Sequence, residues 1–191
     1  MITFVAAALT LNVLGIVLSF HVPCGSTYYQ TGLCYRPLFR DFPSEVYPSP
    51  PVSDGASLTQ EIQVACNGLA ELRLYLIPSV PGDKGQTRFL LKDAENNQIL
   101  IDQSITNDGI LMEDWYPLRF NPDWGSAGKQ YILTIQGINA ATGQGFKILY
   151  TTQSQFDFGN LHQNGQPVQE DIVLQYGCVA GLRKIWLTGK P

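Results

Sequence analysis

The sequence predicts an all-β protein, a jelly-roll-like antiparallel β-sandwich preceded by one N-terminal transmembrane helix. Three observations support this prediction: short apolar–polar alternations separated by turns, an almost wholly apolar N-terminal segment, and 4 cysteines spaced for pairing. The chain has 191 residues, of which 45% are hydrophobic and 15% are charged. This length suits one domain with an appendage, and the apolar content is too high for an intrinsically disordered chain.

The apolar segment spans residues 2–20 and reads ITFVAAALTLNVLGIVLSF. No Asp, Glu, Lys or Arg precedes Arg36. As a helix the segment would be roughly 28 Å long, close to the bilayer's hydrocarbon thickness of about 30 Å. Pro23 and Cys24 follow where a secretory signal would have a small-residue cleavage site. We therefore expect residues 1–20 to be an uncleaved anchor; a signal peptide and the last helix of a shortened multi-pass protein are the alternatives.

Two signals give opposite orientations for this anchor. The two arginines that follow it favour a cytoplasmic C-terminus under the positive-inside rule. An even number of cysteines favours an oxidising compartment, and we expect the disulfides Cys24–Cys34 and Cys66–Cys178. Four buried free thiols are the alternative, whereas zinc binding is not indicated because the chain has no Cys-x-x-Cys motif. We give the cysteines more weight, which predicts a single-pass protein of the cell membrane with an extracytoplasmic C-terminal domain.

Residues 21–56 form a separate segment in which prolines recur. Proline lacks a backbone donor and disfavours helix, so we expect an extended stalk near the membrane surface. The segment is also rich in Tyr and Phe. These rings would either lie at the level of the lipid headgroups or pack on the folded domain, and the sequence leaves both open.

Residues 57–191 show the period-two alternation of half-buried strands. The alternations lie within residues 58–66, 70–76, 89–91, 99–105, 115–120, 131–135, 146–151, 171–177 and 183–187. Turn-forming pairs such as Asn67-Gly68 separate them, and no convincing amphipathic helix is visible. Short strands of this kind predict a sandwich. A Cys66–Cys178 bond requires the first and last strands to be close together, which favours a jelly roll over an immunoglobulin sandwich.

Five stretches of this region match the motifs of a known module: residues 60–76, 89–93, 115–122, 128–135 and 164–167. The first reads QEIQVACNGLAELRLYL, the third WYPLRFNP and the last NGQP. They resemble a recurrent bacterial β-sandwich module, similar to the carbohydrate-binding, galactose-binding-like jelly rolls attached to membrane proteins and glycosyltransferases. The resemblance implies the jelly-roll fold. Because these motifs are core and turn positions, it implies no particular sugar-binding residue.

The sequence contains one leading candidate for a glycan site. Such sites combine a flat aromatic face with amide and carboxylate partners on an exposed surface. Trp124 has Asp123 and Asn121 beside it in a Gly-rich turn, although a Trp at such a place often only anchors its loop. Trp115 lies in the middle of an expected strand, and we expect it in the core.

A second candidate site comprises Tyr150, Asp157 and Asn160 in a later polar stretch. Asp157 and Asn160, together with Asp114, could ligate a structural calcium, but without a dense cluster of Asp residues we predict no metal site. The motifs of serine hydrolases, zinc proteases, P-loop proteins and c-type haem proteins are absent. We therefore expect no catalytic residue and no cofactor.

The function classes that remain are non-catalytic. The 12 Lys and Arg against 16 Asp and Glu, a net charge of −4, exclude general binding of nucleic acid. We expect a membrane-anchored accessory or structural subunit of a larger membrane complex, whose extracytoplasmic sandwich makes protein contacts. Its expected partners are membrane lipid and other membrane protein subunits. The alternative is a membrane-tethered glycan-binding module at the cell envelope.

Overall fold

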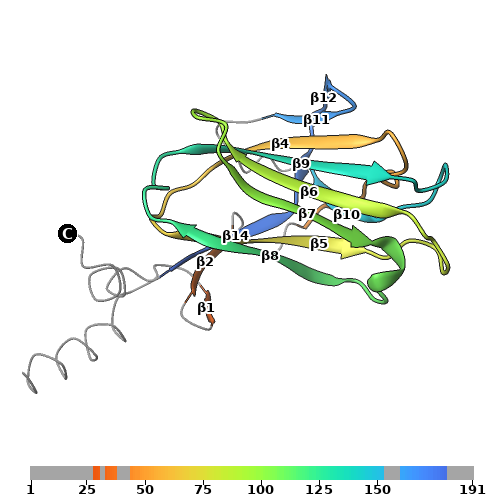
Figure 1. Ribbon diagram of the computed structural model, residues 1–191, viewed down its shortest axis with the longest axis horizontal. Helices are drawn as coiled ribbons and strands as arrows, with labels where there is room; N and C mark the ends of the chain where they lie inside the picture. The colour runs from red at the N-terminus through yellow and green to blue at the C-terminus, as the bar shows by residue number, and fades with distance from the viewer. Residues whose placement is uncertain (1–27, 31–32, 38–43, 153–159, 180–191) are drawn as a thin grey trace, which may run out of the picture.

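The described part of the chain forms two antiparallel β-sheets packed face to face (Figure 1). A computed structural model describes residues 28–30, 33–37, 44–152 and 160–179. The expected all-β sandwich is therefore confirmed. The expected helix over residues 1–20 and the cysteine at position 24 lie outside the described residues. Within the described residues, no helix has both the length and the apolar character needed to cross a membrane.

Sheet I contains eight strands in the order β1-β2-β14-β5-β10-β13, with β3 paired to β10 and β8 paired to β5. Their bounds are Tyr28–Gln30 (β1), Leu33–Pro37 (β2), Val46–Pro48 (β3), Leu69–Ile77 (β5), Asp114–Asp123 (β8), Lys147–Thr151 (β10), Asp171–Ile172 (β13) and Leu174–Val179 (β14).

Sheet II contains six strands in the order β12-β11-β4-β9-β6-β7. Their bounds are Ser57–Gln63 (β4), Gln86–Asp93 (β6), Ile99–Thr106 (β7), Gln130–Ile138 (β9), Leu161–Gln163 (β11) and Gln166–Pro167 (β12). From β4 to β11 the chain changes sheet at every connection except the β6–β7 hairpin. A short 3-10 turn, Asn107–Gly109, lies between β7 and β8.

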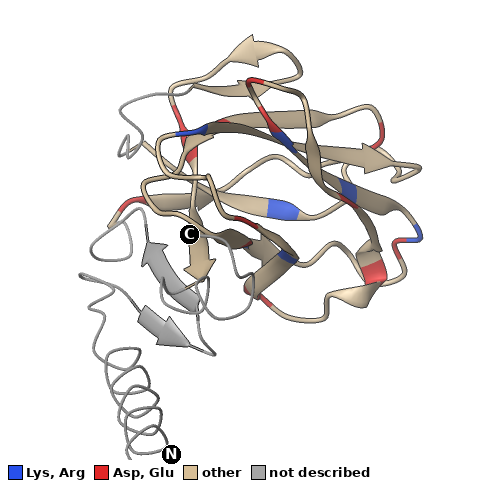
Figure 2. Ribbon diagram, turned by 60° about the vertical axis from the view of Figure 1, so that its left-hand side comes forward, with Lys and Arg blue, Asp and Glu red and all other residues tan. Residues whose placement is uncertain are grey.

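The core lies between the two sheets, because successive side chains of a strand point to opposite faces. In β5, Leu72, Leu74 and Leu76 are fully buried and face β6 and β9, where Phe89 and Leu133 are equally buried. The alternation seen in the sequence thus defines the inner faces of both sheets. Lys and Arg positions are interspersed with Asp and Glu positions over the whole sandwich (Figure 2).

The described part of residues 21–56 is extended, as expected, and it pairs with the sandwich. Strand β2 pairs with β14, and β3 pairs with β10. Val52 is buried in the core, and its N–H donates to the carbonyl of Phe146 at 2.9 Å. Tyr47 packs edge-on against Tyr150 at a ring-centroid distance of 6.2 Å. At Tyr47, the aromatic ring therefore contacts the folded domain.

Trp115 lies outside the main core. Its ring packs edge-on against Tyr75 of β5 at 5.6 Å, in a smaller cluster with the buried Leu149 and Val173. Because β5 points Leu72, Leu74 and Leu76 inward, the intervening Tyr75 faces away from the sandwich interior. We expected Trp115 in the core because it lies in the middle of a strand. The ring is only partly buried, on the outer face of the sheet, because the position of a residue along a strand does not show which face its side chain occupies.

Candidate functional site: a groove between two edge strands

Two edge strands, β7 of sheet II and β8 of sheet I, form the open side of the sandwich. Among the described residues, β7 pairs with β6 alone and β8 pairs with β5 alone. Strand β8 contains Pro117 and Pro122, which suits an edge strand because proline cannot donate to a ladder. An edge strand leaves one row of backbone N–H and C=O groups without a strand partner.

Both edge strands are irregular at the same place. In β7, Leu91 lies opposite Ile101 while Lys92 lies opposite Ile99, so Leu100 is an extra residue. In β8, the register against β5 shifts between Arg119 and Asp123. Such bulges redirect side chains and are over-represented at sheet edges and beside active sites.

Two adjoining hollows lie along these irregular segments. The first, of about 480 Å³, is lined by residues 98–100 and 121–125, and the second, of about 530 Å³, by residues 100–103 and 119–121. They share Leu100 and Asn121. We call the combined feature, residues 98–103 and 119–125, the β7–β8 groove.

Trp124 is held at one end of this groove by the Asn67-Gly68 turn. Gly68 has a φ of 80°, and a Cβ built on it would lie 3.3 Å from two carbons of the Trp124 six-membered ring. The N–H of Gly68 donates to the carbonyl of Asp123 at 3.0 Å. The indole therefore packs closely on Gly68, where a side chain would require the ring to shift, while it also lines the first hollow.

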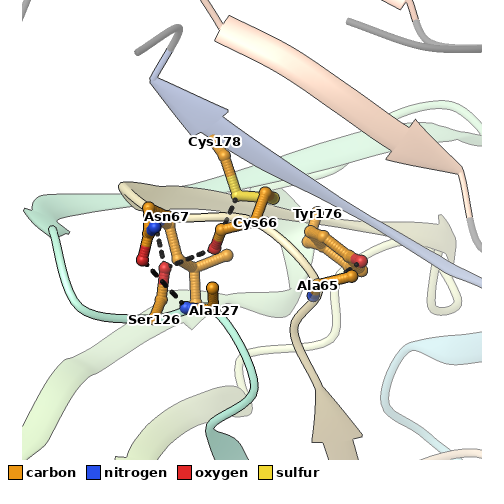
Figure 3. The surroundings of a disulfide bond; sticks show 8 residues. Ala65, Cys66, Asn67, Ser126, Ala127, Tyr176 and Cys178 are labelled. Atoms are coloured by element: carbon orange, nitrogen blue, oxygen red, sulfur yellow. Dashed lines mark hydrogen bonds between the residues drawn. A yellow bond between two sulfur atoms is a disulfide. The ribbon is translucent and has the colours of Figure 1, made fainter.

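A disulfide holds this turn in place. Cys66 is bonded to Cys178 of β14 (Figure 3), which confirms that expected pairing. The carbonyl of Cys66 accepts a hydrogen bond from the Ser126 hydroxyl at 2.7 Å, and that hydroxyl accepts one from the N–H of Leu69 at 3.0 Å. The Asn67 side chain accepts the N–H of Ala127 at 3.2 Å. The segment after Trp124 is thereby attached to the disulfide-bonded turn.

Asp123 is bound by charged and polar groups of the protein itself. Its carboxylate accepts hydrogen bonds from Lys129 Nζ at 3.0 Å and from the Tyr131 hydroxyl at 2.7 Å. Lys129 also contacts the buried Asp93 at 3.1 Å. Burial alone would raise the pKa of Asp123, but the hydrogen bonds from Tyr131, Lys129 and the Gly125 N–H outweigh it and hold the pKa below its ordinary value. Hydrogen bonds to Asp123 and Asp93 raise the pKa of Lys129.

The other charged groups of the groove are also paired. Asp102 binds Arg88 in a bidentate pair at 2.7 Å, and this bond holds the pKa of Asp102 below its ordinary value. Arg119 donates to the fully buried Glu71 at 2.9 Å, and Arg73 binds the same carboxylate. The charges at the groove therefore compensate one another.

The structure brings the leading candidate residues together in the groove and places Tyr150 and Asn160 of the second set elsewhere. Trp124, Asp123 and Asn121 all line the first hollow. Tyr150 is only 3% exposed and belongs to the core. Asn160 is exposed just before β11, and the residue at position 157 lies outside the described residues.

Sequence reasoning missed the β7 side of the groove. Gln98, Leu100, Asp102 and Gln103 line it, but their place opposite β8 depends on how the two sheets stack. A weak signal was present in β8, whose two prolines mark an edge strand. Within the described residues, no three His, Cys, Asp or Glu residues lie together as a metal site would require.

Comparison with known proteins gives little further information. No protein-family model matches the chain, and no curated protein matches it. One matching solved structure is a mutant of xylanase 10C from Cellvibrio japonicus in complex with xylopentaose, with a TM-score of 0.39 and 11% identity. The match covers 57% of this chain and 24% of that chain. A likeness of this size supports no conclusion about function.

Proposed function

We propose that this chain is a membrane-tethered, non-catalytic recognition module whose β-sandwich binds glycan in the β7–β8 groove. The observation that supports the proposal most is the position of Trp124 and Asn121 in one groove. The half-buried indole lines one end of the groove, and the exposed amide lies where the two hollows join. An aromatic face packs on the apolar face of a sugar ring, while amides bind its hydroxyls.

The connectivity supports the finer assignment of the sandwich to the jelly-roll-like class. Closing two sheets by repeated crossing between them is how jelly rolls protect most of their edges. Here every connection from β4 to β11 crosses except one hairpin. The groove is formed by one edge strand of each sheet, β7 and β8.

A glycan array probed with the full chain tests the proposed function. The chain is solubilised in a zwitterionic detergent without a sugar headgroup, because an alkyl glycoside would compete for the groove. We expect binding to at least one glycan and a loss of about tenfold or more in affinity for Trp124→Ala. Trp115→Ala is the matched control, since it removes the same kind of ring from β8 outside the groove, whereas Trp124 lies in the turn directly after that strand. Absence of binding to every glycan, or equal losses in both variants, would refute the proposal.

A second candidate function, protein contact within a larger membrane complex, is supported by the loop between β7 and β8. Leu111 is 86% exposed and Met112 is 70% exposed. The base of this loop is fixed by Asn107, which is buried and donates to Asp83 at 2.8 Å. Two adjacent exposed apolar side chains on a loop whose base is held in this way give a partner a small apolar surface to contact. Purification in mild detergent should retain specific membrane proteins with the native chain and lose them with Leu111→Ser/Met112→Ser.

A further inference from the structure

We propose that the β7–β8 groove takes an extended, uncharged oligosaccharide along its length, in preference to a single sugar or an acidic glycan. This inference rests on the proposed glycan-binding function and specifies its ligand class. Three features of the groove support it: its length, the pairing of its charges, and the backbone groups of its two strands.

The length follows from the residues that line the groove. Trp124 lies at one end, and at the other the Gln103 amide donates to the Tyr116 hydroxyl at 3.1 Å, linking the two edge strands. Six residues on each side, 98–103 and 119–124, line the groove between these points. Six residues span five steps of about 3.3 Å, so the groove is at most roughly 17 Å long, because the two bulges shorten these segments. A groove of this length accommodates several consecutive sugar rings, whereas a single ring would fill one hollow.

The preference for an uncharged ligand follows from the pairing already described. Each charged side chain that lines the groove, namely Asp102, Asp123 and Arg119, has an opposite charge bound to it at 2.7–3.0 Å. No single-sign field therefore attracts an acidic glycan, and separating one of these pairs for a carboxylate or sulfate ligand would cost hydrogen bonds. The uncharged polar side chains that line the groove are the amides of Gln98, Asn121 and Gln103, and the last of these also donates to the Tyr116 hydroxyl.

The edge strands add repeated hydrogen-bonding groups. Backbone N–H and C=O groups on the outer edges of β7 and β8 lack a strand partner among the described residues. The two bulges open the edges at Leu100 and Asn121, where the hollows meet. A chain of hydroxyl-bearing rings can bind such groups at successive positions, so each added sugar should contribute to affinity until the groove is filled.

Titration calorimetry with a length series tests this inference. The full chain is titrated with the mono-, di-, tetra- and hexasaccharides of β-linked glucose, mannose, xylose and N-acetylglucosamine, and with hexagalacturonate as the acidic probe. For the sugar that binds, we expect affinity to rise at least about tenfold from the disaccharide to the hexasaccharide, with hexagalacturonate binding more weakly.

Two variants at the end of the groove distant from Trp124 refine the test. Gln103→Ala should weaken the hexasaccharide about threefold to tenfold and leave the disaccharide unchanged. Tyr116→Phe is the control, because it removes the same Gln103–Tyr116 hydrogen bond without changing the amide that lines the groove. Two results would overturn the inference: a disaccharide that binds as tightly as the hexasaccharide, or an acidic hexamer that binds better than every neutral one. In either case, binding that still depends on Trp124 would uphold the proposed function. Failure of every sugar to bind would refute both.

Discussion

The disulfide between Cys66 and Cys178 is the feature whose removal gives the largest calculable effect. The bond joins the turn after β4 to β14 across a sequence separation of 112 residues. In the chain-entropy model, closing a loop of that length in the unfolded state stabilises the fold by about 5 kcal/mol. For a chain of this size, about 2–4 °C in melting temperature corresponds to each kcal/mol. The double variant Cys66→Ala/Cys178→Ala should therefore melt about 10–20 °C lower.

The assay is equilibrium unfolding in urea of the native chain and the double variant, each with and without reductant. Both cysteines are replaced together, so that no unpaired thiol remains at this site. In the double variant, any further loss on adding reductant reports the second expected pair, Cys24–Cys34. A loss below about 1 kcal/mol in the double variant would refute the loop-closure reasoning, because it would mean that the unfolded chain is already restricted to a similar degree.

The same variant connects stability with the proposed site. The Ser126 hydroxyl donates to the Cys66 carbonyl, and Gly68 contacts the Trp124 ring. Both contacts hold the segment around Trp124 against the disulfide-bonded turn. Under conditions in which the variant remains folded, glycan affinity should still fall, because the indole loses its fixed support. Native-like affinity in the folded variant would show that hydrogen bonds alone position Trp124.

Three further changes test other parts of the structure. Tyr131→Phe removes a hydrogen-bond donor from Asp123, whose pKa is lowered in the fold. The stabilisation that this lowered pKa provides is present above the ordinary carboxyl pKa of about 4. It is lost as pH falls through the lower folded value. The variant should therefore lose less unfolding free energy than the native chain between pH 7 and pH 3 in urea titrations. Gly137→Ala places a methyl group against the backbone of residues 52–53 and should cost about 1–3 kcal/mol or more. Thermal melting should show a larger loss for it than for Gly82→Ala, where the methyl group meets open space and the cost is only the backbone strain of a φ of 82°. Leu74→Ala removes a fully buried side chain and should cost about 2–5 kcal/mol in urea unfolding.

The sheets could be predicted from the sequence because burial is periodic within each strand. In β5, Leu72, Leu74 and Leu76 alternate with polar or partly exposed neighbours, and the inner face follows directly from that pattern. The Cys66–Cys178 pairing was also predictable, because the two cysteines lie near the two ends of the strand-forming region and a jelly roll brings its first and last strands close together. The pairing of the described residues before position 56 could not be predicted, because whether an extended, proline-rich segment is free or paired depends on strands that are distant in sequence. Val52 shows this: its burial depends on Phe146 and the rest of the folded sandwich.

The groove was predictable only on one side, for a physical reason. Trp124 and Asn121 are close in sequence, so their proximity is local, whereas Leu100 lies beside them only because β7 and β8 are edge strands of different sheets that face each other. The role of Asp123 illustrates the same limit. Sequence reasoning placed its carboxylate beside Trp124 as a ligand-binding group, and in the fold this carboxylate lines the groove and also binds Lys129 and Tyr131. The carboxylate therefore also positions the turn that carries Trp124, a role that depends on side chains of β9 and its approach and that no local pattern around residue 123 indicated. The uncharged polar side chains that line the groove are amides, which can both donate and accept hydrogen bonds.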